Sequence, residues 1–188
     1  MKNLWISIKI TLAMCVVLFV GYVLVLRLVA WVASPNDGEA PVVTYNGKVV
    51  GAANVGQVFT DSVYFWGRPS NVDYNGGGSG GSNKGTNNPE YLAQVEERID
   101  AFLAAHPYLS REEVPAEMVT ASGSGLDPDI SPRGAQAQVR RVAEARGLDI
   151  ATVRHLVDSL TQKPWLGLFG TEKVNVLRLN VALEELNE

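Results

Sequence analysis

Hydrophobic positions are concentrated near the start of the chain, where an apolar run from Ile10 to Ala33 is broken by one charge, Arg27. A bilayer core about 30 Å thick is crossed by ~20 helical residues, so the run is long enough to span it with some tilt. Its leucine, isoleucine, valine and phenylalanine side chains contribute about −0.3 to −0.6 kcal/mol each, which outweighs about +3 kcal/mol for one arginine. The pattern predicts a single transmembrane helix over residues 10–33.

The charges that flank this run predict its orientation. Lys2, Lys9 and the terminal amine precede the helix, whereas the residues directly after it include only acidic charges, Asp37 and Glu39. By the positive-inside bias, residues 1–9 are cytoplasmic and residues 34–188 are extracytoplasmic. A cleaved signal peptide is the alternative, but its apolar part is usually only ~7–15 residues long. We therefore expect a retained, single-pass anchor in the cell membrane.

After residue 34 the apolar positions follow the short periods of a small soluble domain. Asn46-Gly47, between two runs rich in valine, predicts a β-hairpin. Helical spacing follows three capping residues, namely Asn88, Ser131 and Asp149. Residues 174–179 read as a strand and residues 180–186 as a closing helical turn. About 150 residues bury one ordinary core, so we expect one mixed α+β domain over residues 34–188.

Composition restricts the chemistry of this domain. The only cysteine, Cys15, lies in the predicted span, so the domain has neither a disulfide nor a thiol ligand. Beyond residue 34 there are 13 basic and 20 acidic residues, and such a mildly acidic domain gives no footprint for nucleic acid. His106 and His155 lack a second ligand at metal-site spacing, so no metal site is expected.

Three further patterns are weak signs of a site. Gly76, Gly78 and Gly81 match a dinucleotide fingerprint in letters, but no strand and helix flank them, and residues 71–88 read as a surface loop. Asp127 and Asp129 are expected to make turns. Arg133, Arg140 and Arg141 could hold phosphate, although a solvated or partner-facing surface is favoured. The residues alone thus predict an anchored domain that is not itself an enzyme, an accessory subunit with no catalytic residue.

Six segments, in order, resemble the C subunit of the bacterial Kdp potassium-transporting P-type ATPase. Together they cover nearly the whole chain, and the most specific of them begins at Ser124. The segments are residues 65–70, 74–83, 88–90, 114–122, 124–146 and 174–183. Departures are local: the glycine run before Ser79 is richer than expected, and Arg140 replaces a proline or apolar residue.

The resemblance implies a potassium import pump with four kinds of subunit in the bacterial inner membrane. The expected partners are a channel-like potassium-binding subunit, a P-type ATPase subunit that hydrolyses ATP, and a small subunit of one helix. This chain would be the non-catalytic accessory subunit needed for assembly or stability. Membrane lipid would surround its anchor.

Two accounts of the subunit follow from the resemblance. In one it is a catalytic chaperone that raises the ATP affinity of the ATPase subunit, with ATP contacts from Gln138 and the turn formed by Ser79, Gly80, Gly81 and Ser82. In the other it is a structural cover on the outer face of the channel-like subunit, with an acidic surface that shapes potassium access. The expected topology favours the cover, because it places these residues outside while ATP is inside.

A separate alternative is a tethered binding module that holds a small ligand with residues 66–87.

Overall fold

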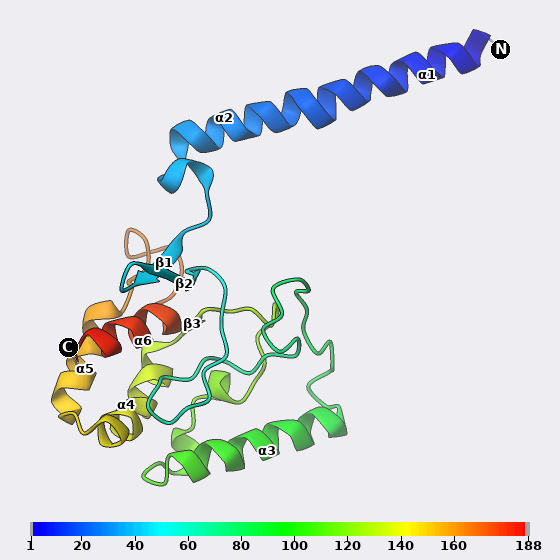
Figure 1. Cartoon of the computed structure of the whole chain (residues 1–188). Coiled ribbons are helices and arrows are strands. Elements are labelled where there is room, and N and C mark those ends of the chain that lie inside the picture. Colours follow the sequence, from blue (N-terminus) through cyan, green and yellow to red (C-terminus); the bar gives the residue numbers. More distant parts are fainter. Residues whose placement is uncertain (1, 187–188) are drawn as a thin grey trace. The chain divides into compact units, whose positions relative to one another are not determined.

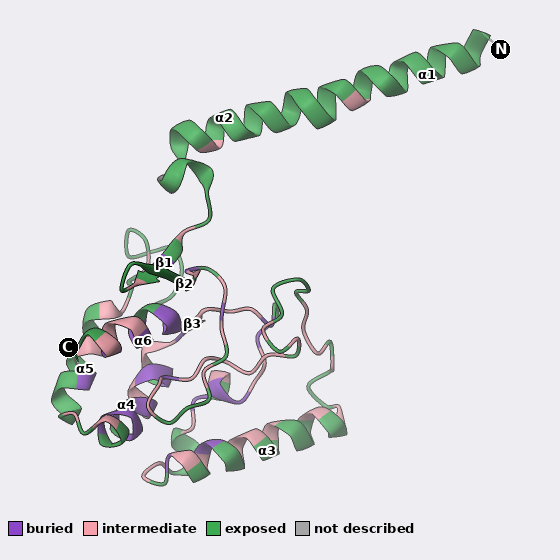
Figure 2. Cartoon of the chain, viewed as in Figure 1, coloured by how far each residue is buried: buried purple, intermediate pink, exposed green. Residues whose placement is uncertain are grey.

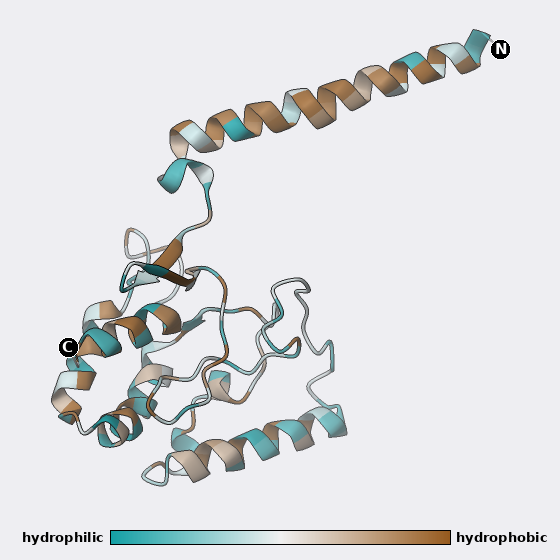
Figure 3. Ribbon diagram, in the orientation of Figure 1, coloured by the Kyte–Doolittle hydropathy of each residue, from teal (hydrophilic) through white to brown (hydrophobic). Residues whose placement is uncertain are grey.

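The computed structural model describes residues 2–186 and divides into two compact units, Met1–Pro41 and Val42–Glu188 (Figure 1). In the first unit one continuous helix comprises α1 (Lys2–Cys15), a π-helical stretch (Val16–Tyr22) and α2 (Val23–Ala33). Among the described residues it is the one helix long and apolar enough to cross a membrane. It begins at Lys2, eight residues before the predicted span, and is apolar along most of its length (Figure 3).

A tight turn follows this helix and reaches back to Arg27, the one charge within the apolar run. Residues Pro35–Gly38 form a 3₁₀ turn, and the Arg27 guanidinium donates to the Glu39 carboxylate at 2.8 Å. Pairing a cation with a carboxylate lowers the cost of holding it near lipid. The charge that interrupts the apolar run is therefore partly compensated by the residues just after it.

The second unit combines helices with two small antiparallel sheets and is α+β, as predicted. β1 (Val42–Tyr45) and β2 (Lys48–Ala52) form the expected hairpin, with positive φ angles of 49° at Asn46 and 72° at Gly47. β3 (Asp129–Ile130) pairs with β4 (Val174–Asn175). The helices are α3 (Pro89–Ala105), α4 (Pro132–Arg146), α5 (Ile150–Leu160) and α6 (Val176–Glu185), with 3₁₀ turns at Arg111–Glu113 and Ala116–Met118.

Local capping explains why three helix starts were predicted correctly. The side chains of Asn88, Ser131 and Asp149 accept hydrogen bonds from backbone N–H groups three residues on, at 3.0–3.1 Å. Each bond satisfies one of the free donors in the first helical turn. These starts depend on short-range sequence, which makes them readable without knowledge of the fold.

The predicted strand over residues 174–179 is wrong beyond Asn175. The Asn175 side chain accepts from Arg178 N at 3.0 Å and so caps a helix that begins at Val176. From there Val176, Leu179 and Leu183 recur at helical spacing and are buried. The C-terminal segment is thus one α-helix, preceded by a strand of two residues.

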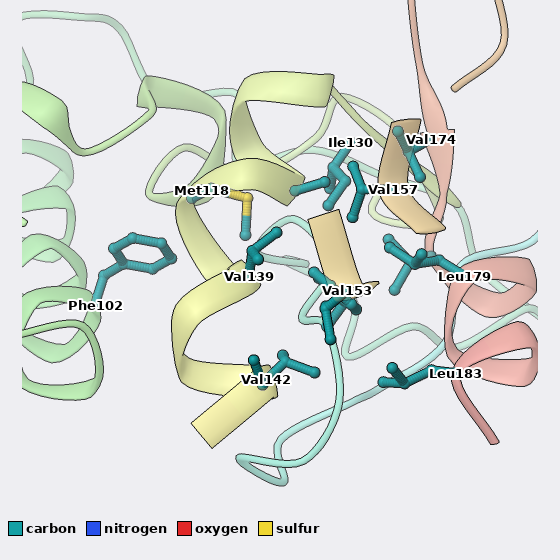
Figure 4. Close-up of a cluster of buried hydrophobic side chains, with 14 of the residues drawn as sticks. Phe102, Met118, Ile130, Val139, Val142, Val153, Val157, Val174, Leu179 and Leu183 are labelled. Atoms are coloured by element: carbon teal, nitrogen blue, oxygen red, sulfur yellow. The ribbon is translucent and has the colours of Figure 1, made fainter. Parts of the chain in front are cut away.

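Besides a small cluster of Val43, Ala53 and Leu177, one main hydrophobic core holds the second unit together (Figures 2 and 4). It is formed mainly by buried valines and leucines of α4, α5 and α6, with contributions from α3 and from the loops. Fully or almost fully buried members include Phe65, Ile130, Val139, Val142, Val153, Val157, Leu179 and Leu183. Only the C-terminal part of α3 packs firmly, because Phe102 is buried while Leu92 is 52% exposed.

Candidate functional site

The predicted nucleotide-contact residue, Gln138, lies completely buried on α4. Its Oε1 accepts from Trp66 N at 2.8 Å and from Arg141 Nη2 at 2.9 Å. Its Nε2 donates to Trp66 O at 3.2 Å and to Gly134 O at 3.1 Å. A glutamine amide offers two donors and two acceptor sites, so all four are used within the domain.

A second buried amide repeats this arrangement one residue earlier in the same segment. Asn180 on α6 accepts from Phe65 N at 2.8 Å through Oδ1 and donates to Phe65 O at 3.0 Å through Nδ2. Gln138 and Asn180 therefore bind the backbone of Phe65–Trp66 as two amide clamps. The segment has no strand partner, and buried backbone groups need partners from elsewhere.

Two arginines satisfy the carbonyl groups that precede the clamps. Arg141 donates to Ser62 O at 2.5 Å and to Tyr64 O at 3.0 Å, and Arg146 donates to Val63 O at 2.7 Å. Helices α4 and α6 thus fix five consecutive residues of an irregular segment through side chains. This is the structural reason for polar residues at these positions in the helices.

The expectation of a solvated or partner-facing surface is wrong for Arg141, although Arg133 and Arg140 are exposed. Arg141 is 7% exposed, and its guanidinium carbon lies 4.1 Å from the centre of the Trp66 ring, a cation–π contact. Among residues 2–186, none of the ion pairs involves Arg141. Burial lowers its pKa from 12.5 to about 10, and neutral acceptors compensate its charge.

His106 completes this network at the C-terminal end of α3. It is at the helix end but fully buried. Its ring stacks on Phe102 at 4.0 Å, Nδ1 bonds to Phe102 O at 2.7 Å, and Nε2 accepts from Arg141 Nε at 2.9 Å. Burial lowers its pKa from 6.5 to about 4. The lowered pKa favours a neutral ring. Because Nε2 accepts from Arg141 and Nδ1 faces a carbonyl oxygen, the proton of that neutral ring is on Nδ1.

The other predicted nucleotide contacts lie on a separate part of the domain surface. Ser79 Oγ and Gly80 N donate to Ser124 O at 3.1 and 2.9 Å. Gly81 packs close to Gly123, and Ser82 Oγ accepts from Lys84 N at 3.4 Å. In the described chain no hydrogen bond joins this segment to Gln138. The structure therefore does not assemble the five residues into one cluster, and ATP binding to them stays a prediction.

Gly125 lies against the loop that contains Val72 and Gly80, and its position requires glycine. It has φ of +69°, and a Cβ there would lie 2.5 Å from Val72 Cγ2 and 2.9 Å from Gly80 O. Gly125→Ala is expected to lower the free energy of unfolding by about 1–3 kcal/mol, from backbone strain and overpacking. Gly123→Ala is the control, because nothing lies within 4 Å of its added Cβ. Equal denaturation midpoints for the two variants would contradict this contact.

A mostly apolar groove of about 300 Å³ lies beside the network, between the loops and α3. Trp66, Tyr74 and Phe102 line it, with Arg68 and Arg98 as the cationic groups. Arg68 pairs with Asp127 at 3.0 Å, and burial raises the pKa of Tyr74. The groove is one concave feature that could take the small ligand of the binding-module alternative, and such binding stays a prediction. Within residues 2–186, no group of three or more His, Cys, Asp or Glu residues is placed to hold a metal ion.

Comparison with known proteins identifies the family. The family model described as KdpC, the K⁺-transporting ATPase c chain, matches residues 4–185. The chain belongs to the KdpC family. A potassium-transporting ATPase KdpC subunit of Bacteroides fragilis (strain YCH46) is 66% identical over 188 residues, covering 99% of this chain and 98% of that protein. The KdpC subunit of Flavobacterium psychrophilum is 56% identical over 186 residues, covering 99% of this chain and all of that protein.

The similarity extends to a more distant bacterium. The KdpC subunit of Caldanaerobacter subterraneus subsp. tengcongensis is 44% identical over 179 residues, covering 95% of this chain and 93% of that protein. The expected family is therefore confirmed over the full described chain. As a KdpC subunit, the chain is a component of a K⁺-transporting ATPase complex. Its apolar N-terminal helix fits a membrane-bound subunit.

Proposed function

We propose that this KdpC subunit is a non-catalytic structural cover on the channel-like potassium-binding subunit of the pump. Its domain after residue 34 would lie on the extracytoplasmic side and stabilise the assembly, together with the ATPase subunit and the small one-helix subunit. The observation that carries the proposal is the complete internal use of the Gln138 amide. Because both donors and both acceptor sites of this amide are occupied within the domain, Gln138 has no hydrogen-bonding group left for a ligand.

The net negative charge of the domain also supports its role as a structural cover. The domain carries 20 acidic and 13 basic residues, and a negative surface raises the local concentration of cations. Potassium would be attracted toward the outer mouth of the channel-like subunit without being bound by KdpC. In this proposal the ATPase subunit performs ATP hydrolysis, and KdpC supplies no group to that reaction.

A catalytic-chaperone role is the second candidate, and it now depends on the Ser79–Ser82 turn, in which Ser79 is exposed and the other three residues are half-buried. The informative variant is the double substitution Ser79→Ala and Ser82→Ala in the intact pump, because neither side chain belongs to the core. The cover predicts an ATP KM and an assembled yield equal to those of the wild type. A several-fold rise in the ATP KM at unchanged yield would instead establish the chaperone.

A separate experiment tests on which side of the membrane the domain lies. A cysteine at Gln138 would be unsuitable for labelling because that position is buried. Gln94→Cys, on an exposed face of α3 and in a Cys15→Ser background, gives an accessible thiol. The cover predicts labelling by an impermeant maleimide in cells whose outer membrane is permeabilised and whose inner membrane is intact. Labelling only after the inner membrane is broken would overturn it.

A further inference from the structure

The loop between α5 and β4 exposes four large apolar side chains together. In residues 164–170, which we call the apolar tip, Trp165, Leu166, Leu168 and Phe169 are 70%, 71%, 80% and 60% exposed. The tip is part of the orange loop between α5 and α6 in Figure 1. Contiguous apolar surface of this kind marks an interaction site on a soluble domain.

The apolar tip is an ordered turn that is held by its own backbone hydrogen bonds. Trp165 N and Phe169 O are 2.9 Å apart, Phe169 N and Trp165 O are 3.0 Å apart, and the two rings lie 5.5 Å apart. Below the tip, the backbones of Gln162 and Lys173 pair through bonds of 2.8 and 3.1 Å. Because the backbone of the turn is already ordered, burying its side chains costs little further backbone entropy.

The base of the tip adjoins the point at which the chain enters the domain. Asn175, two residues after Lys173, donates to Ala53 O at 2.8 Å. Ala53 directly follows β2, whose last residue pairs with Val42, the first residue of the second unit. Only residues 34–41 separate Val42 from the end of the apolar helix, and eight residues reach at most about 29 Å when fully extended. Chain length therefore keeps this end of the domain near the membrane that holds the helix.

The composition of the tip matches the membrane–water interface. No acidic residue occurs between Gln162 and Thr171, and the one charge there, Lys163, is exposed. Tryptophan and phenylalanine beside leucines and a lysine suit the boundary between headgroups and acyl chains, where the lysine can extend to the headgroups. An aqueous role would leave all four apolar side chains in water.

We propose that the apolar tip inserts into the membrane–water interface of the bilayer that holds the N-terminal helix. The domain then has two membrane contacts, a spanning helix and a shallow aromatic turn. The inference requires the anchor but neither the cover nor a particular side of the membrane. Its failure is therefore distinguishable from failure of the proposed function.

The test uses the full chain in lipid nanodiscs without partner subunits. An environment-sensitive dye is attached to Leu168→Cys in the Cys15→Ser background, with the same dye on Gln94→Cys as the matched control. We expect the Leu168 dye to emit at shorter wavelength and to be quenched several-fold more by lipids that carry a spin label near the headgroup. The Gln94 dye should instead be quenched by aqueous iodide.

A second variant excludes insertion by the dye itself. Adding Trp165→Ser and Phe169→Ser to the Leu168 label is expected to abolish most of the lipid quenching, because the two aromatic rings provide the interfacial affinity. Retained quenching would overturn the proposal by assigning the contact to the dye. Equal iodide access at Leu168 and Gln94 would also overturn it. So would shielding of Leu168 that arises only in the assembled pump without lipid quenching, which would assign the tip to a partner subunit.

Discussion

Replacing Arg141 by methionine is expected to lower the free energy of unfolding by about 3–5 kcal/mol, because it leaves the buried His106 Nε2 and two partly buried backbone carbonyl groups without this donor. The wild-type guanidinium bonds to Ser62 O, Tyr64 O, Gln138 Oε1 and His106 Nε2. Methionine fills similar space but offers no N–H group. The measurement is urea unfolding of the purified full chain in mild detergent, followed by near-ultraviolet circular dichroism.

The adjacent arginine provides the control for this prediction. Arg140 is exposed and pairs with Glu144 at 2.7 Å on the surface of α4. Surface ion pairs of this spacing contribute about 0.3–0.5 kcal/mol, so Arg140→Met should change stability little. A loss for Arg141→Met as small as that for Arg140→Met would show that the buried network does not stabilise the domain.

Acidification is expected to destabilise the domain through His106. The unfolded chain binds a proton on this histidine near pH 6.5, whereas the native ring does so only near pH 4. Between these values the unfolded state holds more protons, so the free energy of unfolding falls as the pH falls from about 6.5 to about 4. The contribution lost across this window is about 3 kcal/mol.

The measurement is the free energy of unfolding at several pH values for the wild type and two variants. His106→Gln removes the titrating ring, so its stability should depend less steeply on pH in this window. His155→Gln is the matched control, because His155 is exposed on α5 and lies outside the buried network. Parallel pH profiles for the wild type and His106→Gln would contradict the role of the buried neutral histidine.

Features that depend on neighbouring residues were predictable from the sequence. The hairpin at Asn46-Gly47 and the helix starts at Asn88, Ser131 and Asp149 depend on turns and caps of a few residues. The end of β4 was predicted wrongly although its signal is equally local, because the Asn175 cap of α6, which accepts from Arg178 N three residues on, was not recognised. A run of valines and leucines reads as a strand unless that cap is recognised.

The candidate site was predictable only in part, because its contacts join residues that are far apart in the sequence. Only the family resemblance singled out Gln138, and it did so as a nucleotide contact. Its partner Trp66 is 72 residues away, and Arg141 reaches carbonyl groups 77 and 79 residues away. A spacing of three or four along α4 does not reveal which polar side chains turn inward. Arg140 and Arg141 are neighbours in sequence, yet one is exposed and the other buried.

The two amide clamps also determine when the domain can finish folding. The clamp from Asn180 to Phe65 closes a separation of 115 residues, and the one from Gln138 closes 72. Contacts of such range form slowly, because the loop entropy is lost before the contacts are gained. Phe65 cannot acquire its final partners until α6 has been synthesised. A growing chain that stops short of Asn180 thus holds an incomplete core. The packing of the domain is completed only when α6 is in place.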